Sequence, residues 1–345
     1  MQRRKYVLDQ VLSLSQTKID IPTRNIIDAI ILTVEATYSN SSGSDVTITD
    51  EDLAKAIQEI RVVSDGAVVH YALSLSDLLI INYYDTAGKV PRLDSLNTIP
   101  ASGTLTKRFT IRLDGGDIVA AIKQSLSISI LTNKTISSEV SLQDLKIIPT
   151  IDEIVLEDVS ELTELYGENL EEVIEPKVTA IETNVYPNTS FTGIVEMPTG
   201  NAILRSFYIA KNNTGARSDT IIDQYGMVDR NSTILYKVPW ITGQDLDRQE
   251  YNIDNIIKGV TILDYAEEMA EGESEIFDEE FGVKGWNYVQ GDYYDAFKIN
   301  ETGKIRIIRH ELILTDELKE IIDSGENVDI DWEIDDEDLV DEEEF

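Results

Sequence analysis

The sequence contains no cysteine, and this absence excludes a disulfide framework, a thiolate metal site and a cysteine nucleophile. Histidine is almost as scarce, because His70 and His310 are the only two. Each lies within a strand-like pattern, which favours a structural role over that of a metal ligand or general base. No run approaches the roughly 20 consecutive apolar residues that a membrane-spanning helix requires.

Basic residues are few beside acidic ones, with 29 Lys and Arg against 65 Asp and Glu and a net charge of −36. A surface of this sign repels nucleic acid over most of its area, so we expect no direct sequence-specific binding to DNA or RNA. The N-terminal segment, MQRRKYVLDQVLSLSQ, has polar residues among its apolar ones and no small-residue cleavage site after them. Secretion through a signal peptide is therefore not expected.

Carboxylates are so abundant that any two of them can be drawn as a glycosidase pair, which makes such pairing uninformative without geometry. The sequence Gly115-Gly116-Asp117 lacks the spacing and the following Lys-Ser/Thr of a phosphate-binding loop. The acidic stretch from Asp264 to Glu280 suits a hard cation such as calcium, although a solvated loop explains it as well. We therefore predict no catalytic or metal-binding residue and no cofactor, with structural calcium as the one alternative.

Short strand patterns separated by turn residues dominate the chain and fall into two sets. Between residues 52 and 88, a short helix with Leu53, Ile57 and Ile60 at helical spacing leads into a hairpin around Asp65-Gly66. Ser74 then caps a second helix in a capping-box spacing with Asp77. No helix of 10 to 15 residues alternates regularly with the strands, which indicates β-sandwiches rather than βαβ units.

The strand segments of the first set are residues 18–22, 26–38, 105–113, 126–131 and 140–148, and those of the second are 180–185, 190–197, 202–210, 233–238, 260–265 and 305–314. We accordingly divide the chain into an N-terminal arm (1–17), a first sandwich (18–155), a linker (156–177), a second sandwich (178–320) and an acidic C-terminal tail (321–345).

The first set carries the order IPTRNIIDAIILTVEATY, DLAKAIQEIRVVSDG, VVHYALSLSDLLIINYYDTAG and FTIRLDGGDIVAAI, and ends in SEVSLQDLKIIP. This order resembles the first jelly roll of double-jelly-roll major capsid proteins, and KVPWITGQDLDRQEYNIDNIIKGVTILDY and TGKIRIIRHELIL are similar to parts of the second. The resemblance covers most of residues 18–315. It is strongest to the capsid proteins of tailless icosahedral archaeal viruses and of related methanogen or thermophile proviruses.

The resemblance implies an all-β fold of two tandem eight-stranded jelly rolls, with short helical insertions and an N-terminal helix. It implies a structural protein without enzymatic activity, made in the host cytoplasm and located in the virion. Three copies would form a homotrimeric capsomer of pseudo-hexagonal outline, and capsomers would build an icosahedral shell together with minor capsid or penton proteins. The alternatives are a vertex or turret protein of the same particle, and a carbohydrate-binding or carbohydrate-cleaving β-sandwich enzyme.

The N-terminal arm begins with the basic residues Arg3, Arg4 and Lys5. Apolar residues follow from Tyr6 to Leu14, and their spacing places most of them, Leu8 included, on one side of a predicted helix. Such an arm would either pack under a neighbouring capsomer or lie on the anionic surface of an internal membrane.

Large aromatic side chains contribute most to stability where they are desolvated. We therefore predict that Tyr83, Tyr84, Trp240 and Trp286 are core or interface anchors.

The C-terminal tail contains VDIDWEI at residues 328–334, in which apolar and acidic residues alternate as in a strand. Trp332 would anchor this strand on the sheet edge of a neighbour, unless the tail packs on its own domain or stays disordered. Six Asn-X-Ser/Thr triplets occur, and Asn212 and Asn231 are the strongest candidates for glycosylation if loops of the second roll face outward.

Overall fold

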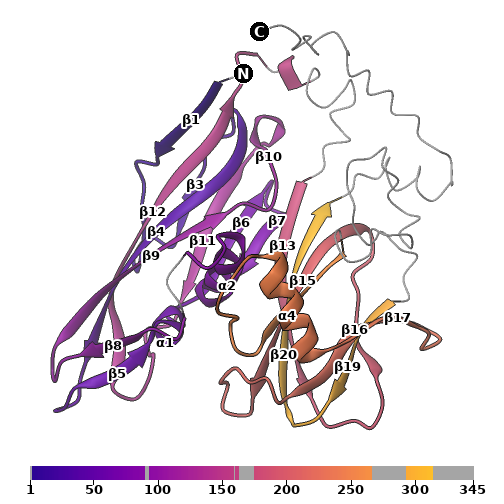
Figure 1. The fold of residues 1–345 in the computed structure, drawn as a ribbon. Coiled ribbons are helices and arrows are strands. Elements are labelled where there is room, and N and C mark those ends of the chain that lie inside the picture. Colours follow the sequence, from indigo (N-terminus) through magenta and orange to yellow (C-terminus); the bar gives the residue numbers. More distant parts are fainter. Residues whose placement is uncertain (1, 90–92, 159, 163–174, 266–292, 314–345) are drawn as a thin grey trace, which may run out of the picture.

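Two β-sandwiches lie side by side in the computed structural model, which describes residues 2–89, 93–158, 160–162, 175–265 and 293–313 (Figure 1). The first sandwich, at the left of Figure 1, is built from residues up to the end of β12, and the second is built from β13 onward. Both are antiparallel and each is made of two facing sheets, which is the arrangement of a jelly roll. The predicted all-β fold of two tandem sandwiches is confirmed.

The first roll has eight principal strands, the first of which is interrupted. One sheet has the order β1 (Gln2–Val7) with β2 (Leu12–Ser13), β12 (Val140–Val155), β4 (Ile26–Asn40) and β9 (Thr104–Leu113). The facing sheet has the order β3 (Lys18–Asp20), β11 (Leu126–Thr132), β6 (Ile57–Ser64) and β7 (Val68–Leu73). The short β10 (Ile118–Val119) also pairs with β4, and β5 (Val46–Thr49) pairs with β8 (Leu96–Ile99) beside the roll.

The second roll repeats this topology strand for strand. Its first sheet has the order β13 (Glu175–Val185), β20 (Gly303–Ile313), β15 (Asn201–Asn212) and β18 (Val260–Asp264). Its second sheet has the order β14 (Thr192–Glu196), β19 (Tyr293–Ile299), β16 (Ile222–Asp229) and β17 (Ile234–Pro239). If strands are counted along each roll, both rolls have one sheet in the order 1-8-3-6 and another in the order 2-7-4-5.

The segment between residues 50 and 85 folds largely as its pattern predicts. The hairpin of β6 and β7 turns at Asp65 and Gly66, which both have positive φ (50° and 73°), as a type I′ turn requires. Helix α2 (Leu75–Asp85) begins with the predicted capping box of Ser74 and Asp77. The first helix, α1 (Asp50–Ala54), is shorter than predicted, because Ile57 and Ile60 lie in β6 instead.

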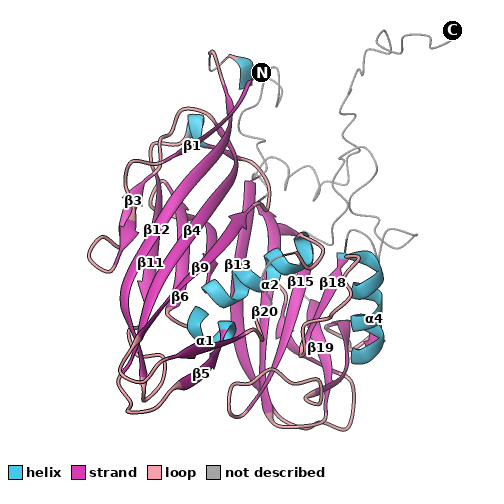
Figure 2. Cartoon of the chain, turned by 60° about the vertical axis from the view of Figure 1, so that its left-hand side comes forward, coloured by secondary structure: helices cyan, strands magenta, loops and turns pink. Residues whose placement is uncertain are grey.

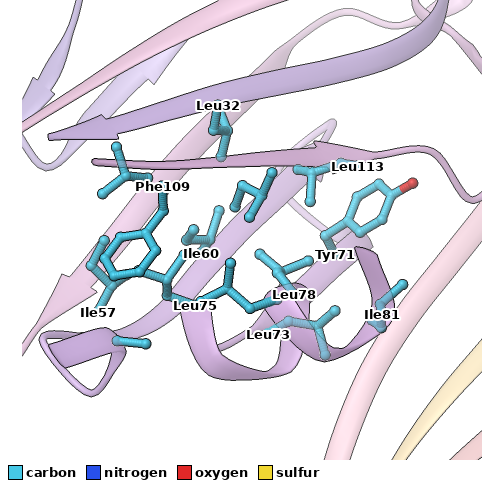
Figure 3. Close-up of a cluster of buried hydrophobic side chains, with 14 of the residues drawn as sticks. Leu32, Ile57, Ile60, Tyr71, Leu73, Leu75, Leu78, Ile81, Phe109 and Leu113 are labelled. Carbon is cyan, nitrogen blue, oxygen red and sulfur yellow. The ribbon is translucent and has the colours of Figure 1, made fainter. Parts of the chain in front are cut away.

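The hydrophobic core of the first roll lies between its two sheets and extends beneath α2 (Figure 3). Alternate residues of each strand point into it, as the two-residue period of a strand dictates. Leu32 and Phe109 enter from one sheet and Ile60 and Leu73 from the other, while Leu78 enters from α2. The second roll has a separate core.

The predicted N-terminal helix is wrong, because residues 2–7 form strand β1. Six residues of β1 pair antiparallel with residues 150–155 of β12, and β2 continues the pairing at Leu12 and Ser13. The apolar spacing in this short segment fits a helix and a strand alike, and the backbone partner in β12 decides between them. The N-terminal segment is therefore part of the first sheet rather than a separate arm.

Most predicted strands are confirmed. The N-terminal strands β1 and β2, the short strands β5, β8 and β10, and two principal strands of the second roll were not predicted. Strands β16 and β19 escaped prediction because polar or glycine residues interrupt the apolar alternation in IDQYGMVD and because YYDAFKI carries a buried aspartate, Asp295. Within the described residues, no helix is long and apolar enough to span a bilayer. The predicted partly helical linker (156–177) and the tail (321–345) lie largely or wholly outside those residues.

Candidate assembly interface

The two rolls are joined by backbone pairing. Strand β7 of the first roll lies parallel to β13 of the second, with Tyr71 opposite Val178 and Ala72 opposite Thr179. This pairing merges one sheet of each roll into a single eight-stranded sheet, seen running through the middle of the molecule in Figure 2. Because the hydrogen bonds of a sheet restrict sliding and rotation between strands, the rolls are held in one relative orientation.

Helix α2 attaches the first roll to the second through ion pairs at both of its ends. Near its start, Asp77 accepts two hydrogen bonds from the guanidinium of Arg306 on β20, at 2.7 and 2.6 Å. At its end, Asp85 lies 2.7 Å from Nη1 of Arg205 on β15. The Asp77 side chain is only 3% exposed, so this pair is largely shielded from solvent.

Aromatic side chains fill the space between α2 and the second roll. Tyr84 packs edge-on against Phe207 of β15 and against Tyr251, with ring centroids 5.8 and 5.5 Å apart. The neighbouring Tyr83 donates a hydrogen bond of 2.6 Å to the carbonyl oxygen of Asn255. Tyr83 and Tyr84, predicted as core or interface anchors, are indeed buried at this junction.

Of the other two predicted anchors, Trp240 is buried in the core of the second roll and Trp286 lies outside the described residues.

A groove of 510 Å³ follows the seam between the rolls, between α1 and two loops of the second roll at residues 214–217 and 255–258. Arg217 crosses the groove wall to pair with Glu51 at 3.0 Å. The groove is therefore bridged by an ion pair that joins the two rolls.

Both histidines are buried in strands, as predicted. His70 lies between the hydroxyl of Ser64 (2.9 Å) and the carbonyl oxygen of Pro176 (3.1 Å), so it also links the two rolls. His310 accepts a hydrogen bond of 3.0 Å from Nε of Arg205. Burial lowers the pKa of both imidazoles, and for His310 the adjacent Arg205 lowers the pKa further. Both are therefore neutral structural groups at pH 7.

Asp295 and Arg309 form an ion pair inside the second roll, where the Tyr208 hydroxyl also donates to Asp295 at 2.8 Å. Burial raises the pKa of the Asp295 carboxyl. Since Asp295 is fully buried, a substrate does not reach it. No group of three or more His, Asp or Glu able to hold a metal occurs among the described residues, and most of the acidic stretch 264–280 considered for calcium lies outside them.

The basic residues at the N-terminus are paired along the first sheet. Arg3 lies 3.0 Å from Asp28 and Lys5 lies 2.8 Å from Asp152, while Arg4 pairs with Glu153. Tyr6 is half-buried, with its hydroxyl 3.4 Å from Glu153. Leu8 is 8% exposed and belongs to the core of the first roll. The structure thus places four of these five predicted residues on β1 and the fifth, Leu8, directly after its end, turned away from the surface.

The predicted glycosylation residues differ in their surroundings. Asn231 is exposed in the turn between β16 and β17. Asn212 is half-buried at the end of β15, and its side-chain oxygen accepts hydrogen bonds from the amides of Thr214 and Ala216. Asn40 is 3% exposed and its amide group donates to backbone oxygens, which removes it as a candidate. Trp332 lies outside the described residues.

Comparison with solved structures matches the whole two-roll arrangement. The major capsid protein of Sulfolobus turreted icosahedral virus superposes with a TM-score of 0.77 at 20% identity, over 91% of this chain and 97% of that chain. The chain has the double-jelly-roll capsid fold. The capsid protein P2 of bacteriophage PM2 matches with a TM-score of 0.55 at 11% identity, over 91% of this chain and 98% of that one.

The PBCV-1 virus capsid also shares the double jelly roll, with a TM-score of 0.57 at 11% identity over 90% of this chain and 94% of that chain. No family model matches the sequence, and no curated protein does. The double jelly roll is therefore shown by its three-dimensional arrangement, at levels of sequence identity that establish fold alone.

Proposed function

We propose that the protein is a major capsid protein that self-assembles into trimeric capsomers of pseudo-hexagonal outline, which tile an icosahedral shell. The observation that carries this proposal is the pair of topologically identical rolls held in one orientation by the β7–β13 pairing and by α2. Three such chains supply six similar rolls, which is the number needed to fill a hexagonal tile. The structural neighbours, which are components of viral capsids, support the same function and a location in the virion.

The proposal assigns the protein no enzymatic activity. Its buried ion pairs and both histidines have structural partners in the described part of the chain, and the partners it needs are other copies of itself and the minor or penton proteins of the shell. A vertex or turret protein of the same particle would be expected to form five-fold assemblies instead. A carbohydrate-active sandwich would bind or cleave sugars.

The mass of the purified protein in solution tests the proposal. Light scattering should give three times the 38.7 kDa of one chain, and negative-stain images of that species should have a hexagonal outline. A pentamer would support the vertex protein. A stable monomer that binds or cleaves a sugar would support the third function and contradict the first.

For the N-terminal segment we propose packing within the shell rather than contact with an internal membrane. The pairing of Arg3, Arg4 and Lys5 with carboxylates and the burial of Leu8 support packing, because these four side chains already have partners within the first roll. Flotation of assembled protein with anionic vesicles tests this. Binding that is lost when all three cations are changed to Ser would favour the membrane.

We further propose that Trp332 anchors the tail on a neighbouring copy and that Asn231 and Asn212 accept glycans. Deleting residues 328–345 should weaken contacts between capsomers while leaving the capsomer intact, and unchanged shell assembly would contradict this role. Intact-mass spectrometry of protein from infected or producing cells tests glycosylation. A mass equal to that of the bare chain would exclude it.

A further inference from the structure

A buried glutamate occupies the same position in both rolls. Glu153 on β12 and Glu311 on β20 are each 2% exposed, and each lies on the eighth principal strand of its roll. Glu153 lies opposite Arg4 of the first strand of its roll, and Glu311 lies opposite Lys177 of the first strand of the second roll. The two carboxylates are therefore equivalent in the repeat, and they differ in the cation beside them.

In the second roll, this carboxylate holds a lysine and an asparagine side by side. Nζ of Lys177 donates a hydrogen bond of 2.9 Å to Oε2 of Glu311, and Nδ2 of Asn201 donates one of 2.7 Å to the same oxygen. Lys177 belongs to β13 and Asn201 to β15, the two strands that flank β20 in the sheet (Figure 2). Because both nitrogens bind one oxygen atom, Glu311 keeps the amine and the amide close together.

The first roll has the same arrangement with arginine in place of lysine. Nε of Arg4 and Nδ2 of Asn25 each donate a hydrogen bond of 2.8 Å to Oε1 of Glu153. A guanidinium stays protonated in proteins and is not a nucleophile, whereas a lysine amine becomes one when it loses a proton. Of the two arrangements, that of the second roll alone places a nucleophile beside the amide.

The three groups of the second roll have the roles that exchange of an amide requires. A lysine attacks a carbonyl carbon after losing a proton, and Glu311 is within hydrogen-bond distance of Nζ to accept it. The same carboxyl group, once protonated, contacts the Asn201 amide and can pass the proton to the nitrogen that leaves. Because Glu311 is shielded from solvent, water competes poorly with the amine for the amide carbon.

We infer that Lys177 and Asn201 become joined by an isopeptide bond, with Glu311 as the catalytic residue. Nζ of Lys177 bonds to Cγ of Asn201, and the bond between Cγ and Nδ2 breaks. Of the three protons on the lysine ammonium, one stays on the new amide and two leave with Nδ2 as an ammonium ion, and Glu311 ends as the carboxylate it was. The reaction takes place once within each chain, so it is separate from the proposed assembly and does not depend on it.

A cavity of 240 Å³ beside these groups gives the ammonium ion a way out. Lys177 and Glu311 line it, together with Glu196, which is exposed. The Lys177 side chain is 30% exposed, so the product does not have to cross the core. The bond would join β13 to β15 across β20, close to the start of β13 and the end of β20, where strands fray most easily.

Peptide mapping of the full chain with trypsin tests the inference. Trypsin cleaves after unmodified lysine and arginine, so an unlinked chain yields residues 147–177 and 178–205 as separate peptides. A linked chain should yield residues 147–205 as one peptide, lighter by one ammonia, about 17 Da, and the intact protein should be lighter by the same mass. Fragment ions should place the link between positions 177 and 201.

Two variants, each checked for folding by circular dichroism, separate the roles of the side chains. Lys177→Arg reproduces the arrangement of the first roll, so it should fold and yield the two separate peptides at unchanged mass. Glu311→Gln retains the size of the side chain but does not accept the proton, and it should slow linking at least about a hundredfold.

Two outcomes would overturn the inference. Separate peptides of unchanged mass from the folded, unaltered protein would show that the bond does not form, and they would leave the capsid proposal intact. Linking at an unchanged rate in Glu311→Gln would show that Glu311 is not the catalytic residue.

Discussion

Replacing Asp77 should disconnect α2 from the second roll at a measurable cost in stability. The Asp77 carboxylate accepts hydrogen bonds from the amide and hydroxyl of Ser74, and it also accepts two from the half-buried guanidinium of Arg306. Asp77→Ala therefore removes half of a capping box, worth about 1 kcal/mol, and leaves a charged partner unpaired, which costs about 3–5 kcal/mol. The expected loss of about 4–6 kcal/mol is a large part of the about 5–15 kcal/mol that stabilises a typical protein.

Three further variants separate the two contributions. Asp77→Asn keeps a side-chain oxygen that accepts the hydrogen bonds from Ser74, so this variant should lose mainly the stability that comes from the ion pair with Arg306. Asp77→Ala/Arg306→Met replaces the pair with apolar groups and should recover most of the loss, leaving about 1 kcal/mol for the cap. Lys304→Ala breaks an exposed pair with Glu182 and should cost at most about 1 kcal/mol.

Urea unfolding followed by circular dichroism measures these differences at pH 7. A loss for Asp77→Ala no larger than that for Lys304→Ala would refute the reasoning. A double variant no more stable than Asp77→Ala would show that the unpaired Arg306 is not the source of the loss.

Three other perturbations have defined outcomes. Because the pKa of His310 is lower in the folded protein than in the unfolded chain, where it is about 6.5, the unfolded chain takes up the proton first, and stability should fall as pH decreases below about 6.5. His310→Gln should flatten this pH dependence in thermal unfolding measured from pH 7 to 5. Arg309→Leu should destabilise the protein by about 3–5 kcal/mol in urea, whereas Asp295→Asn/Arg309→Leu should recover part of that loss. Deleting residues 1–15 removes the fully buried Leu12 together with β1 and β2, so it should lower the melting temperature instead of leaving a stable roll. An unchanged melting temperature would show that these strands are dispensable for folding.

Local patterns in the sequence predicted the local structure well where one pattern dominated. The Asp65-Gly66 hairpin and the Ser74 capping box were predicted because turn and cap residues act over three or four positions. The N-terminal segment was predicted wrongly as a helix because its few apolar residues fit both periods, and only its pairing with β12, about 150 residues away, resolves the ambiguity. The exposure of Ile241 in helix α4 (Trp240–Glu250) and of Ile234 in β17 had no signal in the sequence, since an exposed and a buried isoleucine look the same there.

The sequence by itself determined the chemistry that is missing and the kind of fold that is present. The absence of cysteine excludes thiol chemistry, and the repeated short strands predict a β-sandwich protein. Only the tertiary structure decided how the rolls meet, through pairs such as Tyr71 with Val178 and Asp77 with Arg306. These partners are separated by more than a hundred residues, so no local periodicity links them, and their contact exists only once both rolls have folded.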